Sequence, residues 1–336
     1  MPSCGNNEKR AEALKFDREA PGGGAERYCT VENNRAVLEW KFYCPETEKQ
    51  GAIRILVRDR EGIPVLEGRQ SLREEELFRA VLLHPHLWEG VKDPYLYSEE
   101  IFLIGENGEE KDRLERKFPI RTLREIPGKG WFLNGETFVR KAVRWRNCEE
   151  AAPSAYFQLF REAGVNTLCV PDLRRQPAAF FALCEKMGFL IWAECDERDC
   201  AGEKAETGAW ERAGRFLEIA DGSLFLQNGE PADGFYRCKA RWSEEPFVYL
   251  SENSLIRQEN GKYTITVYSN QKKTALYVDG LLFEFQSGEE TFVFREIPCS
   301  SAFLCLTAEA GECAVTLAIH RTFTKASLFH DNFPIE

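Results

Sequence analysis

The chain has 336 residues and a mass of 38.6 kDa, a length that indicates two or three domains. Hydrophobic residues make up 43% and charged residues 29% of the total, as in globular proteins with a core. The formal net charge is −11 and there are no basic blocks, which argues against a partner that is nucleic acid or an anionic membrane surface.

The first 26 residues are charged and contain a proline and three glycines at 21–24, so we expect a flexible leader over 1–26. The longest apolar stretch, residues 178–184, is too short to span a membrane, and the leader lacks the apolar segment of a signal peptide. Twelve scattered cysteines without a CxxC pair favour reduced side chains over a disulfide framework. These features predict a cytoplasmic protein.

Residues 27–124 carry the pattern of a β-sandwich. Ile53, Ile55 and Val57 alternate with Arg54 and Arg58, as in a strand with one buried face. Further short apolar runs follow at intervals set by turn residues. A small β-sandwich of about 100 residues is therefore expected here.

Residues 125–246 change character. Three strands are expected at 137–145, 165–170 and 189–193, and the two segments between them have apolar residues at helical spacing. Each helical pattern ends at a glycine, Gly164 and Gly188, where a left-handed C-terminal cap is typical. Alternating strands and helices predict a parallel βαβαβ unit.

Residues 247–336 return to the β pattern. A run from 276 to 285 is interrupted by Asp279-Gly280, a strong hairpin signal, and three more short strands follow. The segment before this region is less clear, because 210–220 fits a helix or a strand. A second β-sandwich is expected over 247–336.

Several motifs, taken in order, resemble glycoside hydrolase family 2, the β-galactosidase family. Residues 84–97 are similar to the end of its first immunoglobulin-like domain, and 118–122 to its Phe-Gly-Ile-Arg strand. Residues 132–136 resemble the start of its TIM barrel. The resemblance continues through the barrel and into the C-terminal sandwich, with the following segments: 164–167, 181–185, 191–194, 242–246 and 264–281. It covers roughly residues 84–320.

The resemblance implies an immunoglobulin-like β-sandwich, a partial (β/α) TIM barrel and a second immunoglobulin-like β-sandwich. The family barrel has eight strands, but here the segment leaving the barrel follows the third strand within about 50 residues, a gap that cannot hold strands four to seven. Those strands carry the family's acid/base and nucleophile glutamates. The leader stands where family members usually have a jelly-roll domain.

The surviving strands suggest a definite order. If residues 216–220 correspond to the family's eighth strand, strands eight, one, two and three form one continuous parallel sheet. This sheet would have two open edges and an uncovered inner face. The sandwiches, the 195–215 segment or a second chain are the candidates to cover it.

Asp172 and Glu194 are the only carboxyl pair placed to attempt glycosidase chemistry. Both follow neighbouring parallel strands, at the edge where barrel enzymes hold their catalytic groups. A retaining glycosidase needs two such groups, one with a raised pKa. The alternative is that Asp172 caps a loop and Glu194 is a scaffold residue.

Trp145 and Arg146 are the candidates for ligand binding, because an exposed indole ring stacks on sugars. Trp192 is expected in the core. In the resemblance, Trp145 and Arg146 replace the family's Arg-His pair at the end of strand one. Cys169 and Asp172 replace its polar pair on strand two. A family-type sugar site would not survive these changes intact.

No metal or cofactor is expected. The acidic and cysteine-containing segment 194–200 matches no zinc spacing, and it reads as a solvated loop. His84 and His86 would share a face if they lay on a strand, but in the resemblance they only precede a buried Leu-Trp.

The leading hypothesis is a family 2-like protein that is catalytically inactive, with a role in carbohydrate binding or in assembly. Its expected partners are a carbohydrate, a second copy or a complementary hydrolase subunit. The alternatives are a minimal glycosidase that hydrolyses β-galactoside-type bonds with Asp172 and Glu194, and a decaying gene product without selected activity.

Overall fold

A computed structural model describes residues 24–43, 51–72, 77–145, 153–193, 217–219, 224–226, 229–299, 303–320 and 327–329. The described residues fall into two compact units. One extends to Phe138 and includes Gln176–Leu190, and the other consists of Val139–Arg175 and the chain from Ile191 onward. In these ranges no helix combines the length and the hydropathy that a membrane span requires. The expected domain limits at 26, 124 and 246 stay predictions.

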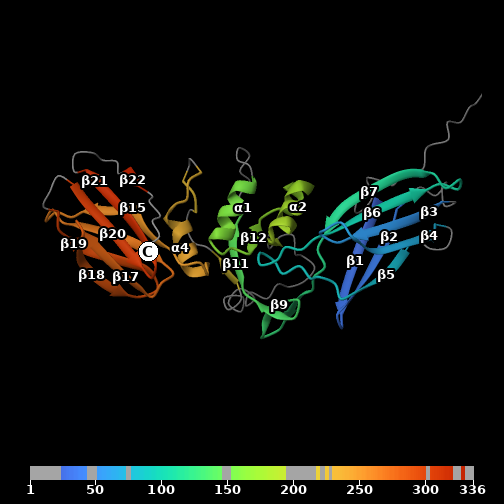
Figure 1. Ribbon diagram of the computed structural model, residues 1–336, viewed down its shortest axis with the longest axis horizontal. Helices are drawn as coiled ribbons and strands as arrows, with labels where there is room; N and C mark the ends of the chain where they lie inside the picture. The colour runs from blue at the N-terminus through green and yellow to red at the C-terminus, as the bar shows by residue number, and fades with distance from the viewer. Residues whose placement is uncertain are drawn as a thin grey trace, which may run out of the picture. The chain divides into compact units, whose positions relative to one another are not determined.

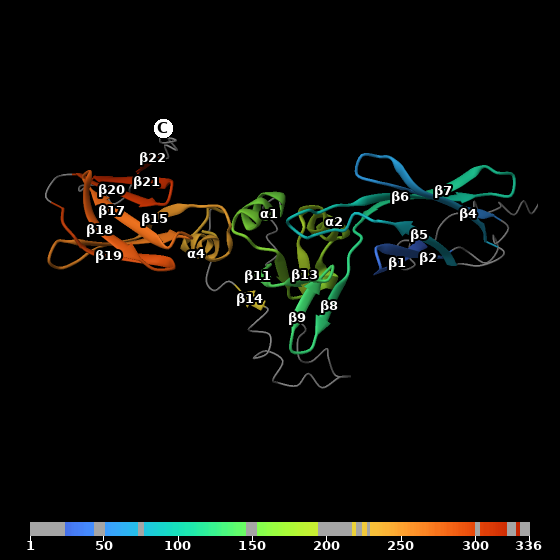
Figure 2. The same ribbon diagram turned by 60° about the horizontal axis from the view of Figure 1, so that its bottom comes forward.

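The first unit contains a sandwich of two antiparallel sheets, which Figure 2 shows as separate layers. The smaller sheet has the order β1-β2-β5, and the larger has the order β4-β3-β6-β7. Ile53, Ile55 and Val57 are buried in the core between them, which confirms the predicted alternation. The strands are β1 (Ala25–Glu32), β2 (Arg35–Phe42), β3 (Ala52–Arg58), β4 (Pro64–Ser71), β5 (Leu77–Leu83), β6 (Tyr97–Ile104) and β7 (Glu110–Phe118).

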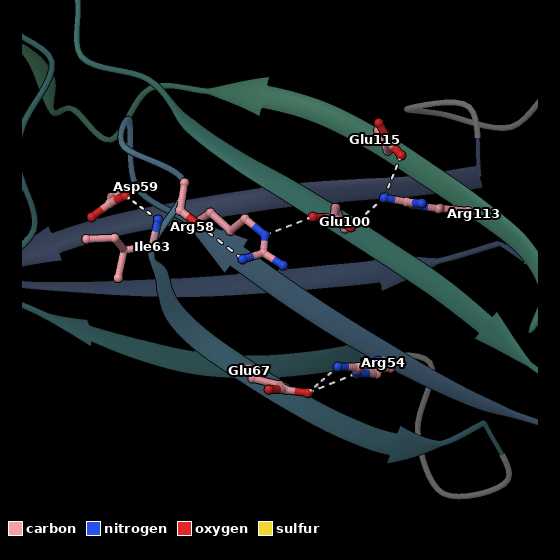
Figure 3. Close-up of polar contacts among 9 residues, drawn as sticks. Arg54, Arg58, Asp59, Ile63, Glu67, Glu100, Arg113 and Glu115 are labelled. Carbon is pink, nitrogen blue, oxygen red and sulfur yellow. Dashed lines mark hydrogen bonds and ion pairs between the residues drawn. The ribbon is translucent and has the colours of Figure 1, made fainter.

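The outer face of the larger sheet carries a row of ion pairs, shown in Figure 3. Glu100 on β6 lies between Arg58 on β3 and Arg113 on β7, at 3.0 and 2.5 Å. The guanidinium of Arg113 also lies 5.0 Å from the ring centroid of Phe102, which is only 9% exposed. The long charged side chains therefore cover apolar surface on a face that would otherwise be open to water.

The same unit contains a small three-stranded sheet and one helix. The sheet has the order β10-β9-β8 and is built from β8 (Leu123–Ile126), β9 (Gly130–Leu133) and β10 (Glu136–Phe138). The helix, α2 (Ala178–Met187), ends at Gly188 with φ 90°, as the sequence predicts. A Cβ atom at Gly188 would lie 2.4 Å from the carbonyl oxygen of Gly90, so the chain crossing at this point requires glycine.

A four-stranded sheet of order β13-β12-β11-β14 begins the second unit. Strand β11 pairs in parallel with both β12 and β14, which confirms that the strand near 216–220 lies beside the one before α1. Its identity with the family's eighth strand stays a prediction. No closed barrel is formed by the described residues. The elements are β11 (Arg140–Arg144), α1 (Pro153–Glu162), β12 (Thr167–Val170), the 3-10 turn η3 (Leu173–Arg175), β13 (Leu190–Ala193) and β14 (Leu217–Ile219).

The second sandwich follows α4 (Asp233–Trp242) and is drawn in orange to red in Figure 1, where most of its strands are labelled. Its sheets have the orders β15-β16-β19 and β18-β17-β20-β21-β22 and share one buried core. Asp279 and Gly280 both have positive φ, which confirms the predicted hairpin turn between β17 and β18. The strands are β15 (Val248–Arg257), β16 (Tyr263–Ser269), β17 (Lys273–Val278), β18 (Leu281–Ser287), β19 (Glu290–Ile297), β20 (Phe303–Ala310), β21 (Cys313–His320) and β22 (Ser327–Phe329).

Candidate functional site

The carboxyl ends of β11, β12 and β13 form the edge at which parallel sheets usually hold ligands and catalytic groups. Trp145 follows β11 and Asp172 follows β12 near this edge. The other two candidates, Arg146 and Glu194, lie outside the described residues. The structure therefore places one residue of each predicted pair and leaves the pairs themselves as predictions.

Asp172 is an ion-paired carboxylate that caps the turn η3. Its Oδ1 accepts hydrogen bonds from the backbone N–H of Arg174 at 3.0 Å and from its Nε at 3.1 Å, and the Nε of Arg175 lies 3.4 Å from Oδ2. The side-chain hydrogen bond from Arg174 is the largest effect that holds the pKa of Asp172 below its usual value. A glycosidase general acid needs the opposite shift. In this geometry Asp172 is an ionised group and a poor proton donor at neutral pH.

Trp145 is buried, so the expectation of an exposed ring is wrong. It is 6% exposed, and its ring meets Phe157 and Phe160 of α1 edge-on, with centroids 5.3 and 6.4 Å away. Its backbone N–H donates to the carbonyl oxygen of Cys169, which extends the pairing of β11 with β12 by one residue. The indole of Trp145 therefore packs against α1, and edge-on aromatic pairs of this kind stabilise a core. The role of Trp145 in ligand binding stays a prediction.

One face of the parallel sheet contains a charged residue that the sequence analysis did not single out. Arg140 on β11 is 6% exposed, and its guanidinium carbon lies 3.2 Å from the ring centroid of Trp192 on β13. Ala142 and Cys169 are buried beside Trp192. No clear signal for this was present in the sequence, because β11 reads Arg-Lys-Ala-Val-Arg and two of its other residues are also basic.

The two histidines of the His-x-His motif bind different groups. Residues 84–86 follow β5 instead of lying on it, and His84 has φ 50°. The Nδ1 of His84 lies 2.5 Å from the Nδ2 of Asn34, whereas the Nε2 of His86 lies 2.5 Å from Asp93. No group of three metal-ligating side chains occurs in the described ranges. The acidic and cysteine-containing segment 194–200 lies outside these ranges.

A buried carboxylate within the first sandwich was also missed. Glu99 on β6 is 1% exposed and accepts hydrogen bonds from Trp40, Arg27 and Arg116 at 2.7, 2.7 and 2.9 Å. The alternation of β6 places Glu99 between the inward-facing Tyr97 and Ile101. The sequence could have indicated this site, because a charged residue at an inward position of a strand requires hydrogen-bond or ion-pair partners in the core.

Glu185 on α2 and Arg121 form a second buried charged pair in the same unit. Burial is the largest effect that raises the pKa of Glu185, and the nearby charge of Arg121 opposes it. Burial also lowers the pKa of Arg121, whose guanidinium carbon lies 4.4 Å from the ring centroid of Trp88. The indole N–H of Trp88 donates to the carbonyl oxygen of Glu185 at 2.9 Å, so these three residues tie α2 to the loop before β6.

No protein-family model matches the chain. It is 27% identical over 241 residues to a β-glucuronidase of Bacteroides fragilis, and 22% identical over 206 residues to a β-galactosidase large subunit of Lactobacillus helveticus. These matches cover 65% and 59% of this chain but 33% and 29% of the relatives. The chain therefore matches about a third of the length of these two curated relatives.

Solved structures agree in fold. An FMN-binding β-glucuronidase from Faecalibacterium prausnitzii L2-6 superposes with a TM-score of 0.75 at 14% identity, covering 92% of this chain and 75% of that one. A glycosyl hydrolase family 2 member from Bacteroides cellulosilyticus superposes with a TM-score of 0.66 at 15% identity, over 91% and 64% of the two chains. Sequence relatives and fold together make this chain a relative of glycoside hydrolase family 2 that corresponds to part of those enzymes.

Proposed function

We propose that this protein is a non-catalytic relative of family 2 glycosidases, with two immunoglobulin-like sandwiches and a partial TIM barrel. The observation that carries the proposal is the strand order β14-β11-β12-β13, in which β11 pairs in parallel with both of its neighbours. In a closed eight-stranded barrel, strand eight lies beside strand one and the last strands complete the circle. This order is what remains when a contiguous arc of four strands is removed.

The length of the chain between β13 and α4 supports this reading. A complete barrel uses about 250 residues for eight strand-helix repeats, or roughly 30 residues for each repeat. Only residues 194–232 lie between the end of β13 and the start of α4, and β14 occupies part of them. This length admits about one repeat by the same measure, whereas the family's two catalytic glutamates follow strands four and seven.

The state of Asp172 is a second support. The minimal-glycosidase alternative needs Asp172 and Glu194 to divide the roles of proton donor and nucleophile. Asp172 is paired with two arginines and its pKa is lowered, which disfavours it as the proton donor. Glu194 would then have to be the donor, with Asp172 as a nucleophile weakened by its ion pairs.

Turnover of nitrophenyl β-galactosides, β-glucuronides and β-mannosides tests this proposal. We expect purified protein to release nitrophenol at the rate of the buffer blank. Activity that disappears in both Asp172→Asn and Glu194→Gln would overturn the proposal in favour of the minimal enzyme. Activity that persists equally in both variants would be assigned to a contaminating glycosidase, and a Lys272→Ala variant provides the matched purification control.

We propose assembly with a complementary hydrolase subunit as the role of the chain. In the described residues β13 and β14 are the outer strands of the parallel sheet, and such edges favour pairing with further strands. One relative is named a β-galactosidase large subunit, which supports a multi-chain context. The seven described free thiols fit a reducing compartment, so we propose a cytoplasmic location.

Light scattering separates this role from self-association. We expect the isolated chain to have a mass near 38.6 kDa at micromolar concentration. A mass of twice that value would favour two copies docked through their partial barrels. The same measurement with a candidate partner should then give the summed mass of one copy of each chain.

A further inference from the structure

The first unit contains a cleft that none of the predicted sites includes. Its volume is about 580 Å³, which is within the range of small-molecule sites. One wall is the loop after β3 together with the start of β6 and the end of β7, and the other is one face of α2. The lining divides into charged side chains (Asp59, Arg60, Lys117, Glu185 and Lys186) and mostly apolar ones, such as Leu96 and Leu183.

Both walls are held in place by contacts that do not involve a ligand. The backbone N–H of Arg60 donates to the hydroxyl of Tyr95 at 3.1 Å, and its guanidinium lies 2.8 Å from Asp93 and stacks on the Tyr95 ring. On the other wall, the bond from Trp88 to the carbonyl of Glu185 holds the last turn of α2. The cleft is thus preformed, which reduces the entropy lost on binding.

The cleft is lined by three basic and two acidic side chains. Lys117 and Lys186 are exposed, and neither has an ion-pair partner among the described residues. Of the two carboxyl groups, Asp59 accepts the backbone N–H of Ile63 at 2.7 Å. Burial raises the pKa of the other, Glu185, and the nearby charge of Arg121 opposes this shift. Two ammonium groups without an ion-pair partner in the described part of the chain therefore line the cleft.

We propose that this cleft binds a small organic anion of monosaccharide size, a ring that carries a carboxylate or a phosphate. The anionic group would bind Lys117 and Lys186, and the C–H face of the ring would lie on Leu96 and Leu183. The hydroxyl of Ser98 and the carboxyl of Glu185 are available for hydrogen bonds to ring hydroxyls. The inference is independent of the proposed loss of catalysis, because the cleft lies outside the parallel sheet.

Calorimetric titration of the full chain tests the inference with four probes at low salt. Glucuronate carries a carboxylate and glucose 6-phosphate a phosphate on rings of the same size, whereas glucose is neutral and inorganic phosphate has no ring. We expect saturable binding of at least one anionic sugar with a dissociation constant of about 1 mM or lower, equivalent to about 4 kcal/mol. Glucose and inorganic phosphate should bind at least tenfold more weakly.

Two variants locate the binding. Lys117→Ala/Lys186→Ala should weaken anion binding at least tenfold, and Lys272→Ala/Lys273→Ala on the second sandwich should leave it unchanged at the same net charge. Ala182→Trp fills the cleft from an exposed position of α2 without altering charge, and it should also abolish binding. Absence of saturable anion binding, equal affinity for glucose, or binding unaffected by both cleft variants would each overturn the inference.

Discussion

The indole N–H of Trp40 donates to Oε2 of Glu99 at 2.7 Å, across 59 residues of sequence. Arg27 and Arg116 bind the other carboxylate oxygen of Glu99, at 2.7 and 2.8 Å. The indole comes from the smaller sheet and the carboxylate from the larger, so this contact crosses the core of the first sandwich. One buried carboxylate thus joins both sheets and is the shared counter-charge of two guanidinium groups.

Glu99→Gln should destabilise the protein by about 3 kcal/mol, because it leaves two arginines without their buried counter-charge. Glu100→Gln is the matched control, since Glu100 is the next residue of β6 and pairs with arginines on the outer face. Its loss should cost less than about 1 kcal/mol. Urea unfolding of both variants checks the difference, and equal costs would show that Glu99 contributes no more than a surface ion pair.

Gly188→Ala should cost more stability than Gly108→Ala, although both glycines have positive φ. Alanine at Gly108 would meet no atom within 4 Å, so it should cost only the backbone strain of about 1 kcal/mol. Alanine at Gly188 would also collide with the backbone of Gly90. We expect at least 2 kcal/mol more for this variant, measured by thermal unfolding. Equal losses would indicate that the two chain segments can move apart freely.

Trp145→Ala should lower the free energy of unfolding by about 3 kcal/mol or more, as expected for removing a buried aromatic side chain. Trp145→Phe keeps an aromatic ring against Phe157 and should recover most of that loss. Chemical denaturation followed by circular dichroism provides the measurement. A fully stable Trp145→Ala variant would restore the interpretation of Trp145 as an exposed ligand-binding ring.

The pKa of Asp172 should lie below the usual 3.8, and Arg174→Gln should raise it towards that value. Because the folded-state pKa is lowered, the stabilising pairing is present above the unfolded-state pKa and is lost as the pH falls through the folded-state value. Carboxyl chemical shifts followed by NMR between pH 2 and 6 report the titration. Arg295→Gln, on an exposed position of β19, is the control and should leave the pKa of Asp172 unchanged. A pKa of Asp172 at or above 3.8 would contradict the ion-pairing account.

Local periodicity explains which parts of the fold were predictable. The alternation of Ile53, Ile55 and Val57, and the glycines that end α1 and α2, depend on backbone geometry within a few residues. The parallel order with β14 beside β11 was also predictable, because the resemblance to a barrel supplied the neighbours of strand one. Each of these features can be read without knowledge of distant side chains.

The side-chain environments depended on contacts between distant segments. Trp145 follows β11 in a segment without a local pattern that indicates burial. It is buried because two phenylalanines on α1 pack against its ring. Glu99 has the right spacing for an inward position, but its partners come from β1, β2 and β7. The cleft beside α2 brings together segments from about 59 to 186, which no local pattern can indicate.

The order β13-β12-β11-β14 also determines where new structure can be added. The chain from 194 to 216 joins the two outermost strands of the sheet, so lengthening it separates no pair of hydrogen-bonded neighbours. Loop closure adds only about 0.6 kcal/mol for each doubling of its length. An engineer could therefore graft further strand-helix repeats at this point and extend the sheet from both ends towards a closed ring. The molecule can in this sense accept additional strands at both edges of its parallel sheet without rearranging the four that are described.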